Sequence, residues 1–582
     1  MTNARIAEKL DLLADLMEFT GVDAFRLRAY RNAARVIAAL PESVATLLNE
    51  NRDALLAIDG IGDSIARKCA TLVSTGTLPQ LEDLLKTVPT SVLDMLRVPN
   101  LGPKKAAILY RELSITTLDQ LKTACEAGKV RVLKGFGEKT EAIILKGLAI
   151  AEAANQRLSW AQADQIATAL RHHFADCPGL RKFELAGSYR RGKETVGDLD
   201  ILVVSVTPDT VMDRFGTFHD IAAVQVRGDT KMSVRLSTGL QIDLRVVPDA
   251  SFGAALQYFT GSKEHNVILR GLAKQHGLRI NEYGVFKDET AIAGATEEEV
   301  YATLNLPAFP PELREGGKEY EWAEKNELPT LITLADMHAD LHAHTTYSDG
   351  KASIREMVAA ARNRGLSCLA ITDHSKRVAM ANGLDPDRLR AQWKEIDQIN
   401  RELEGAFVVL KGVECDILEN GDLDLPDDTL AEADWTVASV HYGQNQPREQ
   451  ITDRIVGALA NPYIHAIGHP TGRLINRREP YDIDLDTVMR AARSYRKYLE
   501  LNADPARLDL CDHHCAAAKS NGVPIVINTD AHSVTGLDNM RYGILVARRA
   551  GLSAADVLNT RPADQLVALL KATARAKPAA FA

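Results

Sequence analysis

The sequence predicts a multidomain protein with an all-α front, an α+β middle and a C-terminal distorted (β/α)7-type barrel. The chain of 582 residues exceeds what one compact core accommodates, and it corresponds to roughly three to five domains of about 100–200 residues each. Residues 1–150 repeat apolar side chains at helical spacing, and residues 178–300 mix β-rich runs with helices. After residue 330, β-rich and helical runs alternate, which indicates a parallel sheet.

The composition is that of a soluble globular chain, with 46% hydrophobic and 25% charged residues. We find no apolar run near the ~18 residues of a membrane span, so no membrane partner is expected. The N-terminus leads into an amphipathic pattern instead of a signal peptide. Seven scattered cysteines do not form a disulfide framework, so we expect a protein of the reducing cytoplasm.

The net charge of -9 argues against a protein that coats nucleic acid through charge alone. The charge is uneven, however. Lys and Arg number 20 against 18 Asp and Glu in residues 1–150, 20 against 26 in residues 151–330, and 29 against 34 in residues 331–582. Only the helical front is net positive, and ten of the fifteen histidines lie at or beyond His338.

The front contains one short pattern three times, in residues 58–66, 98–106 and 133–139. Each copy reads as a helix, a turn of alternating apolar and turn residues, and a second helix. The residues concerned are Gly60 and Gly62, then Gly102 and Lys104, then Gly135 and Gly137, with Asn100 replacing the usual glycine of the second copy. Such turns leave the N–H groups of the following helix free to bind a phosphate. Plain helix packing is the alternative, but three copies resemble helix-hairpin-helix modules and favour binding to the DNA backbone.

Three carboxylates stand out in the middle of the chain. Asp198 and Asp200 are two residues apart in a predicted strand and therefore share a face, and Asp243 lies in another strand. Carboxylates that meet on adjacent strands suit two hard divalent cations, Mg²⁺ or Mn²⁺. An Asp-x-Asp pair alone is weak, but the preceding Gly187-Ser188 turn and Arg191 add groups that bind phosphate oxygens.

Residues 187–200, with residues 258–262 and Asn266, resemble the nucleotidyltransferase core of family X DNA polymerases over roughly a hundred residues. The resemblance implies that Asp198, Asp200 and Asp243 bind two catalytic metals. It also implies a nucleotide site in which Gly187, Ser188, Arg191 and Gly197 hold the triphosphate of a deoxynucleoside triphosphate, Tyr258, Phe259 and Gly261 line the sugar, and Asn266 reads the base, with Arg270 against the template. Lys263 and Val196 depart from the family pattern without touching the carboxylates.

The front also resembles the small lyase domain of these polymerases, around residues 28–34 and the first hairpin. Lys68 falls where that domain carries its Schiff-base lysine. A lysine forms an imine with an abasic sugar if its pKa is lowered. Lys68 is equally placed for a phosphate contact, so both interpretations stay open.

A histidine or an acid closes each of seven successive predicted strands in the back of the chain. These strands cover residues 337–341, 368–372, 407–412, 435–440, 464–468, 498–501 and 524–528. The ends of barrel strands converge on one face, so this pattern predicts metal binding there. The pattern resembles the PHP domain over about 240 residues, and the resemblance implies three ions. One would take His342, His344, Glu414 and Asp530; a second would share Glu414 and add His441 and His469; the third would take Asp349, His374 and His532. Mixed ligands of this kind suit Mn²⁺ or Zn²⁺.

Residues 511–515, Cys-Asp-His-His-Cys, also have a metal-like composition. Cys511 and Cys515 would share a helical face, but no second ligand pair follows, so the sequence does not favour zinc at this position.

The chain is identified as a member of the bacterial and archaeal family X polymerases with a C-terminal PHP domain. The expected order is a lyase-like domain (1–85), fingers (86–150), palm (151–250), thumb (251–310), a polar acidic linker (311–334) and the PHP phosphoesterase domain (335–575). The expected substrates are gapped or nicked double-stranded DNA and deoxynucleoside triphosphates. With such substrates we expect a nucleoid-associated protein, and we expect it to be a monomer. The main alternative is a phosphoesterase whose polymerase part only binds DNA, and a non-enzymatic DNA-binding scaffold is a more distant one.

Overall fold

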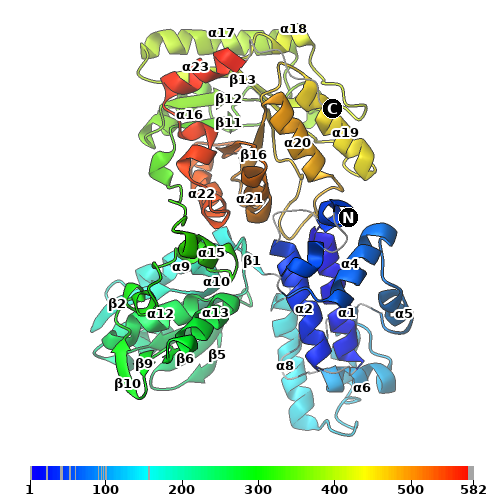
Figure 1. The fold of residues 1–582 in the computed structure, drawn as a ribbon, viewed down its shortest axis with the longest axis vertical. Helices are drawn as coiled ribbons and strands as arrows, with labels where there is room; N and C mark the ends of the chain where they lie inside the picture. The colour runs from blue at the N-terminus through cyan, green and yellow to red at the C-terminus, as the bar shows by residue number, and fades with distance from the viewer. Residues whose placement is uncertain are drawn as a thin grey trace. The chain divides into compact units, whose positions relative to one another are not determined.

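The computed structural model describes residues 3–20, 24–39, 44–50, 54–58, 60–89, 91–92, 95, 98, 101, 103–154 and 157–573. The chain divides into two compact units (Figure 1). The first consists of residues 1–156 with residues 238–240, and the second of residues 157–237 with residues 241–582.

Every described helix is too short or too polar to cross a membrane.

All described elements of the first unit are helices. They are α1 (Asn3–Phe19), α2 (Ala24–Ala39), α3 (Val44–Glu50), η1 (Ala54–Ala57), α4 (Asp63–Thr75), α5 (Pro79–Thr87), α6 (Pro103–Leu113), α7 (Leu118–Glu126) and α8 (Glu138–Ala154). The apolar positions that predicted the first helix, Ile6, Leu10, Leu13 and Met17, are all buried in one core. The apolar residues that recur at helical spacing in the sequence therefore form the packing face of α1.

The three predicted hairpins share one backbone hydrogen bond. The N–H of Ile61 donates to the C=O of Ile58 at 3.1 Å, and the equivalent bond in the third copy joins Phe136 to Leu133 at 3.0 Å. In the second copy Leu101 donates to Val98 at 3.0 Å. The first and third turns each contain a glycine at positive φ, Gly60 and Gly135, a conformation that suits a residue without a Cβ. Gly102 and the Lys104 side chain lie outside the described part of the chain.

The second unit begins with a five-stranded sheet of order β2-β4-β7-β6-β5. Its strands are β2 (Leu180–Leu185), β4 (Asp198–Ser205), β5 (Ile221–Arg227), β6 (Lys231–Leu236) and β7 (Gln241–Val246). Only β4 and β7 run parallel to each other within this sheet. The flanking elements are β1 (Leu158–Ser159), α9 (Trp160–Phe174), α10 (Gly187–Arg190), β3 (Thr195–Val196) and α11 (Pro208–Gly216).

A three-stranded antiparallel sheet with helices follows. It consists of η3 (Asp249–Ser251), α12 (Phe252–Thr260), α13 (Lys263–Gln275), β8 (Leu278–Asn281), β9 (Gly284–Lys287), β10 (Thr290–Ala293) and α14 (Glu297–Ala302). Its core is centred on Leu269, Tyr301 and Phe309.

The structure corrects the expectation for residues 311–334, which the sequence predicts to be a polar linker. The segment holds η4 (Pro311–Leu313), α15 (Lys318–Lys325) and η5 (Leu334–Asp336). Arg314 is only 1% exposed and forms an ion pair with Glu297. Oε1 of Glu319 is 2.9 Å from Nδ1 of His265, within hydrogen-bonding distance. These charges are paired inside the protein, which is why a polar and acidic composition here does not mark an open linker.

Seven parallel strands form the barrel in their sequence order, from β11 to β17. They are β11 (Ala339–Ala343), β12 (Cys368–Ile371), β13 (Val408–Asp416), β14 (Trp435–Ser439), β15 (Ala466–Ile467), β16 (Tyr498–Asn502) and β17 (Ile525–Asn528). The seven predicted strands are thus confirmed. An isolated bridge between Ala343 and Ala531, and the Leu341 N–H donating to Asn528 Oδ1 at 3.0 Å, bring the first and last strands together. The barrel is therefore nearly closed.

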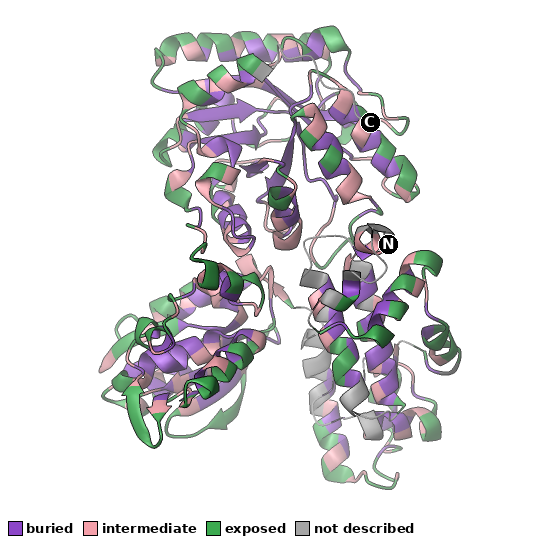
Figure 2. Cartoon of the chain, viewed as in Figure 1, coloured by how far each residue is buried: buried purple, intermediate pink, exposed green. Residues whose placement is uncertain are grey.

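Helices surround these strands, which Figure 2 shows as an almost wholly buried centre. They are α16 (Ile354–Asn363), η6 (Ala379–Ala381), α17 (Pro386–Leu403), α18 (Asp427–Leu430), α19 (Arg448–Ala460), α20 (Leu485–Tyr495), α21 (Asp512–Ser520), η7 (Gly536–Asn539), α22 (Met540–Arg549), η8 (Ala554–Asp556), η9 (Leu558–Thr560) and α23 (Ala563–Thr573). This arrangement places the carboxyl ends of all seven strands on one face of the barrel.

Candidate active sites

The three carboxylates that the sequence singles out, Asp198, Asp200 and Asp243, lie on two adjacent strands of the five-stranded sheet. Asp200 on β4 is directly opposite Asp243 on the parallel neighbour β7. Asp198 is two residues earlier on β4, while Leu199 and Ile201 between and after them are buried. The alternation of a strand therefore places both β4 carboxylates on one face, as predicted.

The electrostatics of this triad favour a divalent cation. Burial, together with the negative charges of Asp198 and Asp243, raises the pKa of Asp200 to about 7. Gln241 donates one hydrogen bond to Asp243, at 3.1 Å from Nε2 to Oδ1. Three neighbouring carboxylates with so little hydrogen-bond support fit hard cations that bind oxygen.

A tight turn borders the triad. Gly187 opens α10 with φ +64°, and a Cβ at this position would lie 2.6 Å from Asp200 Oδ2. The N–H of Ala186 donates to the C=O of Asp200 at 2.8 Å, which fixes the turn against β4. Ser188 and Arg191 follow on the same turn, and Arg191 Nη1 donates to the C=O of Thr260 at 2.5 Å.

The remaining predicted nucleotide-site residues lie on or between α12 and α13, except Gly197. Tyr258 and Phe259 end α12, followed by Gly261, and Asn266 on α13 donates to the C=O of Tyr258 at 2.7 Å. Arg270 is exposed one turn further on, with Nε 3.2 Å from the C=O of Asn266. Gly197 precedes β4, where a Cβ would lie 2.8 Å from Nη1 of Arg157.

Sequence reasoning missed Glu315 as a partner of this region. Its Oε1 is 3.2 Å from Nε of Arg191 and 2.9 Å from Nη1 of Arg549. Burial alone would raise the pKa of Glu315, but Arg549, Lys193 and Arg191 overcome it and lower the pKa to about 2. No local pattern signals this contact, because the partners are more than 100 residues away in the chain.

The second site lies at the carboxyl ends of the barrel strands, with Glu414 at its centre. Glu414 Oε1 is 3.0 Å from His469 Nε2 and 3.4 Å from His441 Nε2. Its Oε2 is 3.5 Å from His342 Nε2 and 3.7 Å from His344 Nε2. The strand-end pattern in the sequence therefore corresponds to one cluster in space.

Three groups within this cluster have ligand atoms close enough to share an ion. They are His342, His344 and Asp530; His374, Glu414 and His441; and His344, Asp349, His374 and His532. The first group holds three of the four residues that the resemblance implies for one ion and lacks Glu414, and the third holds Asp349, His374 and His532 with His344 added. The second holds the expected Glu414 and His441 with His374 instead of His469; His374 Nδ1 is 2.7 Å from Glu414 Oε2.

The cluster fits metal ions because it is buried and short of hydrogen bonds. Within the described residues, several of its ligand atoms have no hydrogen-bond partner, namely His342 Nε2, both ring nitrogens of His344, Glu414 Oε2 and Asp530 Oδ1. Buried polar atoms without partners are costly, and coordination to cations would satisfy them.

Two buried carboxylates, Glu500 and Asp416, contact the Nδ1 atoms of His342 and His441 and orient these rings. Neither was assigned a role from the sequence. Glu500 Oε1 is 2.7 Å from His342 Nδ1, and Asp416 Oδ1 is 2.9 Å from His441 Nδ1. Such contacts fix which ring nitrogen faces a metal. Their signal was available, since Glu500 lies in the sixth strand and Asp416 is two residues after Glu414 on β13.

Lys68 lies half-buried on α4 of the first unit. Its Nζ is 3.0 Å from Ser64 Oγ and 5.4 Å from the centre of the Tyr30 ring.

A carboxylate triad beside a tight turn is thus joined in one chain to a barrel with histidines and acids at its strand ends, an arrangement that fits a polymerase of the β type fused to a PHP domain. Family models agree along the chain. They match a helix-hairpin-helix domain at residues 1–78, a SAM-like helix-hairpin-helix tandem at 92–149, the DNA polymerase beta palm at 157–238, the DNA polymerase beta thumb at 255–315 and the PHP domain at 340–504.

The chain is 42% identical over 571 residues to the DNA polymerase/3'-5' exonuclease PolX of Bacillus subtilis, covering 97% of this chain and 99% of that protein. It belongs to the PolX family of DNA polymerase/3'-5' exonucleases. Part of the chain is also similar to probable phosphatases. One from Thermoanaerobacter sp. is 32% identical over 233 residues, which is 38% of this chain and 89% of that protein, and one from Vibrio campbellii is 27% identical over 259 residues, 42% of this chain and 96% of that protein.

Proposed function

We propose that the chain fills short gaps in DNA during repair by nucleotidyl transfer at Asp198, Asp200 and Asp243. The register of Asp200 and Asp243 beside the Gly187 turn carries this proposal. The substrates are a gapped or nicked double-stranded DNA and a deoxynucleoside triphosphate.

Each predicted residue has one task in this proposal. The three carboxylates would hold two ions of Mg²⁺ or Mn²⁺, and ions bound there would help to activate the attacking hydroxyl and to stabilise the in-line phosphoryl displacement. Ser188, Arg191 and Gly197 hold the triphosphate, Tyr258, Phe259 and Gly261 position the sugar, Asn266 contacts the base, and Arg270 lies against the template. The hairpin turns at Gly62 and Gly137 bind the DNA backbone through main-chain N–H groups.

We further propose that the barrel site removes nucleotides from DNA 3′ ends. Its nine ligands would hold up to three ions of Mn²⁺ or Zn²⁺, and such ions would lower the pKa of a water that serves as the nucleophile. Glu500 and Asp416 keep His342 and His441 in the orientation that ligation needs.

The test separates the two sites. Asp198→Ala with Asp200→Ala should abolish primer extension on gapped DNA and leave hydrolysis of 3′ ends intact. His342→Ala with His344→Ala should do the reverse. Circular dichroism would establish that both proteins are folded. Loss of both activities in either folded double variant would refute two independent sites, and no extension by the wild-type chain would favour the phosphoesterase that only binds DNA.

A phosphatase is the second candidate for the barrel, since its relatives carry the name probable phosphatase. DNA ending in a 3′-phosphate and DNA ending in a 3′-hydroxyl distinguish the candidates. An exonuclease releases nucleotides from the 3′-hydroxyl end, whereas a phosphatase releases only inorganic phosphate from the other substrate.

Lys68 stays a prediction with two interpretations. Borohydride trapping on abasic DNA separates them with Lys68→Arg. An imine requires the lysine amine, so lyase chemistry would be lost in the variant, whereas a phosphate contact would survive. Lys86→Arg, at an exposed lysine on α5, is the matched control.

A further inference from the structure

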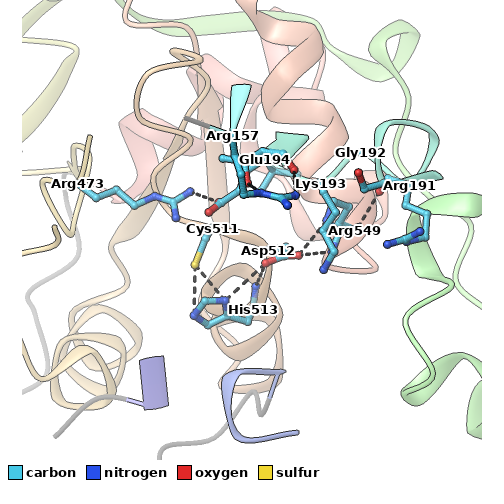
Figure 3. A pocket seen from close by; sticks show the side chains of 13 residues that line it. Arg157, Arg191, Gly192, Lys193, Glu194, Arg473, Cys511, Asp512, His513 and Arg549 are labelled. Carbon is cyan, nitrogen blue, oxygen red and sulfur yellow. Dashed lines mark hydrogen bonds and ion pairs between the residues drawn. The ribbon is translucent and has the colours of Figure 1, made fainter. Parts of the chain in front are cut away.

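A second group of metal-ligating side chains lies at the start of α21 and shares no residue with the barrel-end cluster. Cys511 directly precedes the helix, and its Sγ is 3.3 Å from Nδ1 of His513 and 3.2 Å from Nδ1 of His514. The ligand atoms of all three residues lie within 4.8 Å of one another. Figure 3 shows the Cys511 sulfur turned toward the His513 ring.

These distances suit one tetrahedral ion. With a Zn–S bond of about 2.3 Å and Zn–N bonds of about 2.0–2.1 Å, sulfur and nitrogen ligands lie about 3.6 Å apart. The two observed S···N distances come within a few tenths of an ångström of this value. Small side-chain rotations therefore suffice to admit an ion.

The ligand set differs from the pair that the sequence suggested. Cys515, four residues after Cys511, is fully buried and its Sγ is 3.6 Å from the C=O of Leu510. The extended backbone of Cys511, with φ -75° and ψ 171°, instead brings its sulfur to the two histidines of the first helical turn. The local turn, and not the helical face, assembles the group.

The surroundings leave room for an ion and a further ligand. Cys511 and His513 line a cavity of about 310 Å³. Two of the arginines there face carboxylates: Arg473 Nη2 is 2.7 Å from Glu194 Oε2, and Arg549 Nη2 is 2.7 Å from Asp512 Oδ2 (Figure 3). A divalent ion bound to one thiolate and two neutral imidazoles carries a single net positive charge, and these ion pairs reduce the repulsion that the arginines exert on it.

We propose that Cys511, His513 and His514 bind one Zn²⁺ ion, with the fourth position open to this cavity. A thiolate with two imidazoles selects a borderline-soft ion such as Zn²⁺ over Mg²⁺ or Ca²⁺. Three protein ligands and one open position are the arrangement of reactive zinc sites, whereas structural sites are closed by four.

Cobalt substitution of the full-length protein tests the proposal. A thiolate bound to Co²⁺ gives a near-ultraviolet charge-transfer band that ligands of the barrel site, all nitrogen or oxygen, do not give. We expect the band in the wild-type protein and a weaker band in His513→Gln and His514→Gln. Cys511→Ser should lack the band and should bind about one equivalent of zinc less than the wild type. Cys515→Ser is the matched control and should keep both the band and the zinc.

X-ray absorption at the zinc edge gives a second test on the unmodified chain. A sulfur neighbour at about 2.3 Å is expected in the zinc shell. A wild-type protein without the band and without this sulfur shell would overturn the proposal, as would a band that persists in Cys511→Ser. These readouts are independent of polymerase and nuclease activity.

Discussion

The Cα atom of Gly187 lies against the Asp200 carboxylate, so closely that a Cβ at position 187 would come within 2.6 Å of Oδ2. The turn at Gly187 and the Asp200 side chain of the following strand β4 are therefore in direct contact. A side chain at position 187 cannot be added without moving Asp200.

We predict that Gly187→Ala loses about 100-fold in nucleotide addition, because displacement of Asp200 misplaces the reacting groups. Its positive φ adds a destabilisation of about 1–2 kcal/mol. Gly277→Ala is the control, since Gly277 has φ +70° and no atom within 4 Å of its added Cβ. It should show the same loss in unfolding free energy with normal primer extension. Equal extension rates in the two variants would contradict the assigned contact.

The hairpin glycines give a prediction about DNA binding. Gly62 and Gly137 have no atom within 4 Å of an added Cβ and no positive φ, so alanine there should not disturb the free protein. The methyl group would stand between the main-chain N–H groups and a phosphate. We expect each variant to bind gapped DNA about fivefold more weakly, equivalent to about 1 kcal/mol.

Filter binding over a range of salt concentrations measures this effect. Gly457→Ala on α19, where the nearest atom is at an ordinary 3.7 Å, should bind as the wild type does. The slope of affinity against salt should be modest for all proteins, because a chain of net charge -9 relies on few cation–phosphate contacts. A steep slope would contradict binding through main-chain groups.

Glu500 is predicted to set the metal affinity of the barrel site. Glu500→Gln keeps the size of the side chain but removes the charge that faces His342 Nδ1 at 2.7 Å. We expect a 10–100-fold loss in Mn²⁺ affinity, with nuclease activity falling at limiting metal and recovering at high metal. Glu432→Gln, at a half-exposed carboxylate paired with Arg390, should change neither quantity. Unchanged Mn²⁺ affinity in Glu500→Gln would show that the contact has no influence on ligation.

His465 gives a prediction about pH and stability. Burial, together with the charge of Lys497, lowers the pKa of this ring to about 3. Its Nδ1 accepts a hydrogen bond from the Thr436 N–H at 3.1 Å. The unfolded chain takes up a proton near pH 6.5 and the folded chain does not, so this ring makes the fold less stable as the pH falls from about 6.5 toward 3.

Denaturant titrations should therefore show that His465→Asn loses less unfolding free energy than the wild type below pH 6. The difference should approach about 1.4 kcal/mol per pH unit for one proton. His219→Asn, at an exposed histidine, is the control and should follow the wild type. Parallel pH profiles of His465→Asn and the wild type would contradict the neutral buried ring.

Much of the fold was predictable because its signals are local. The buried runs that became β11 to β17 are continuous in the sequence, and each strand starts within two residues of its expected position. The ligand types were predictable as well, since a histidine or acid at a strand end can be read from the chain. Parallel barrel topology then forces those ends together, so His342 and Glu414 meet although 72 positions separate them.

Only the tertiary structure decided which distant groups pair. Glu500 with His342, Glu315 with Arg191 and Arg314 with Glu297 join side chains far apart in the sequence. Residues 311–334 are folded because their charged side chains pair with buried groups elsewhere in the chain, and composition does not reveal such pairs. By itself the sequence determined the elements and the chemistry available at their ends, because periodicity and residue type act over a few positions. Partner choice required the fold, because the energy of a buried charge depends on what lies beside it in space.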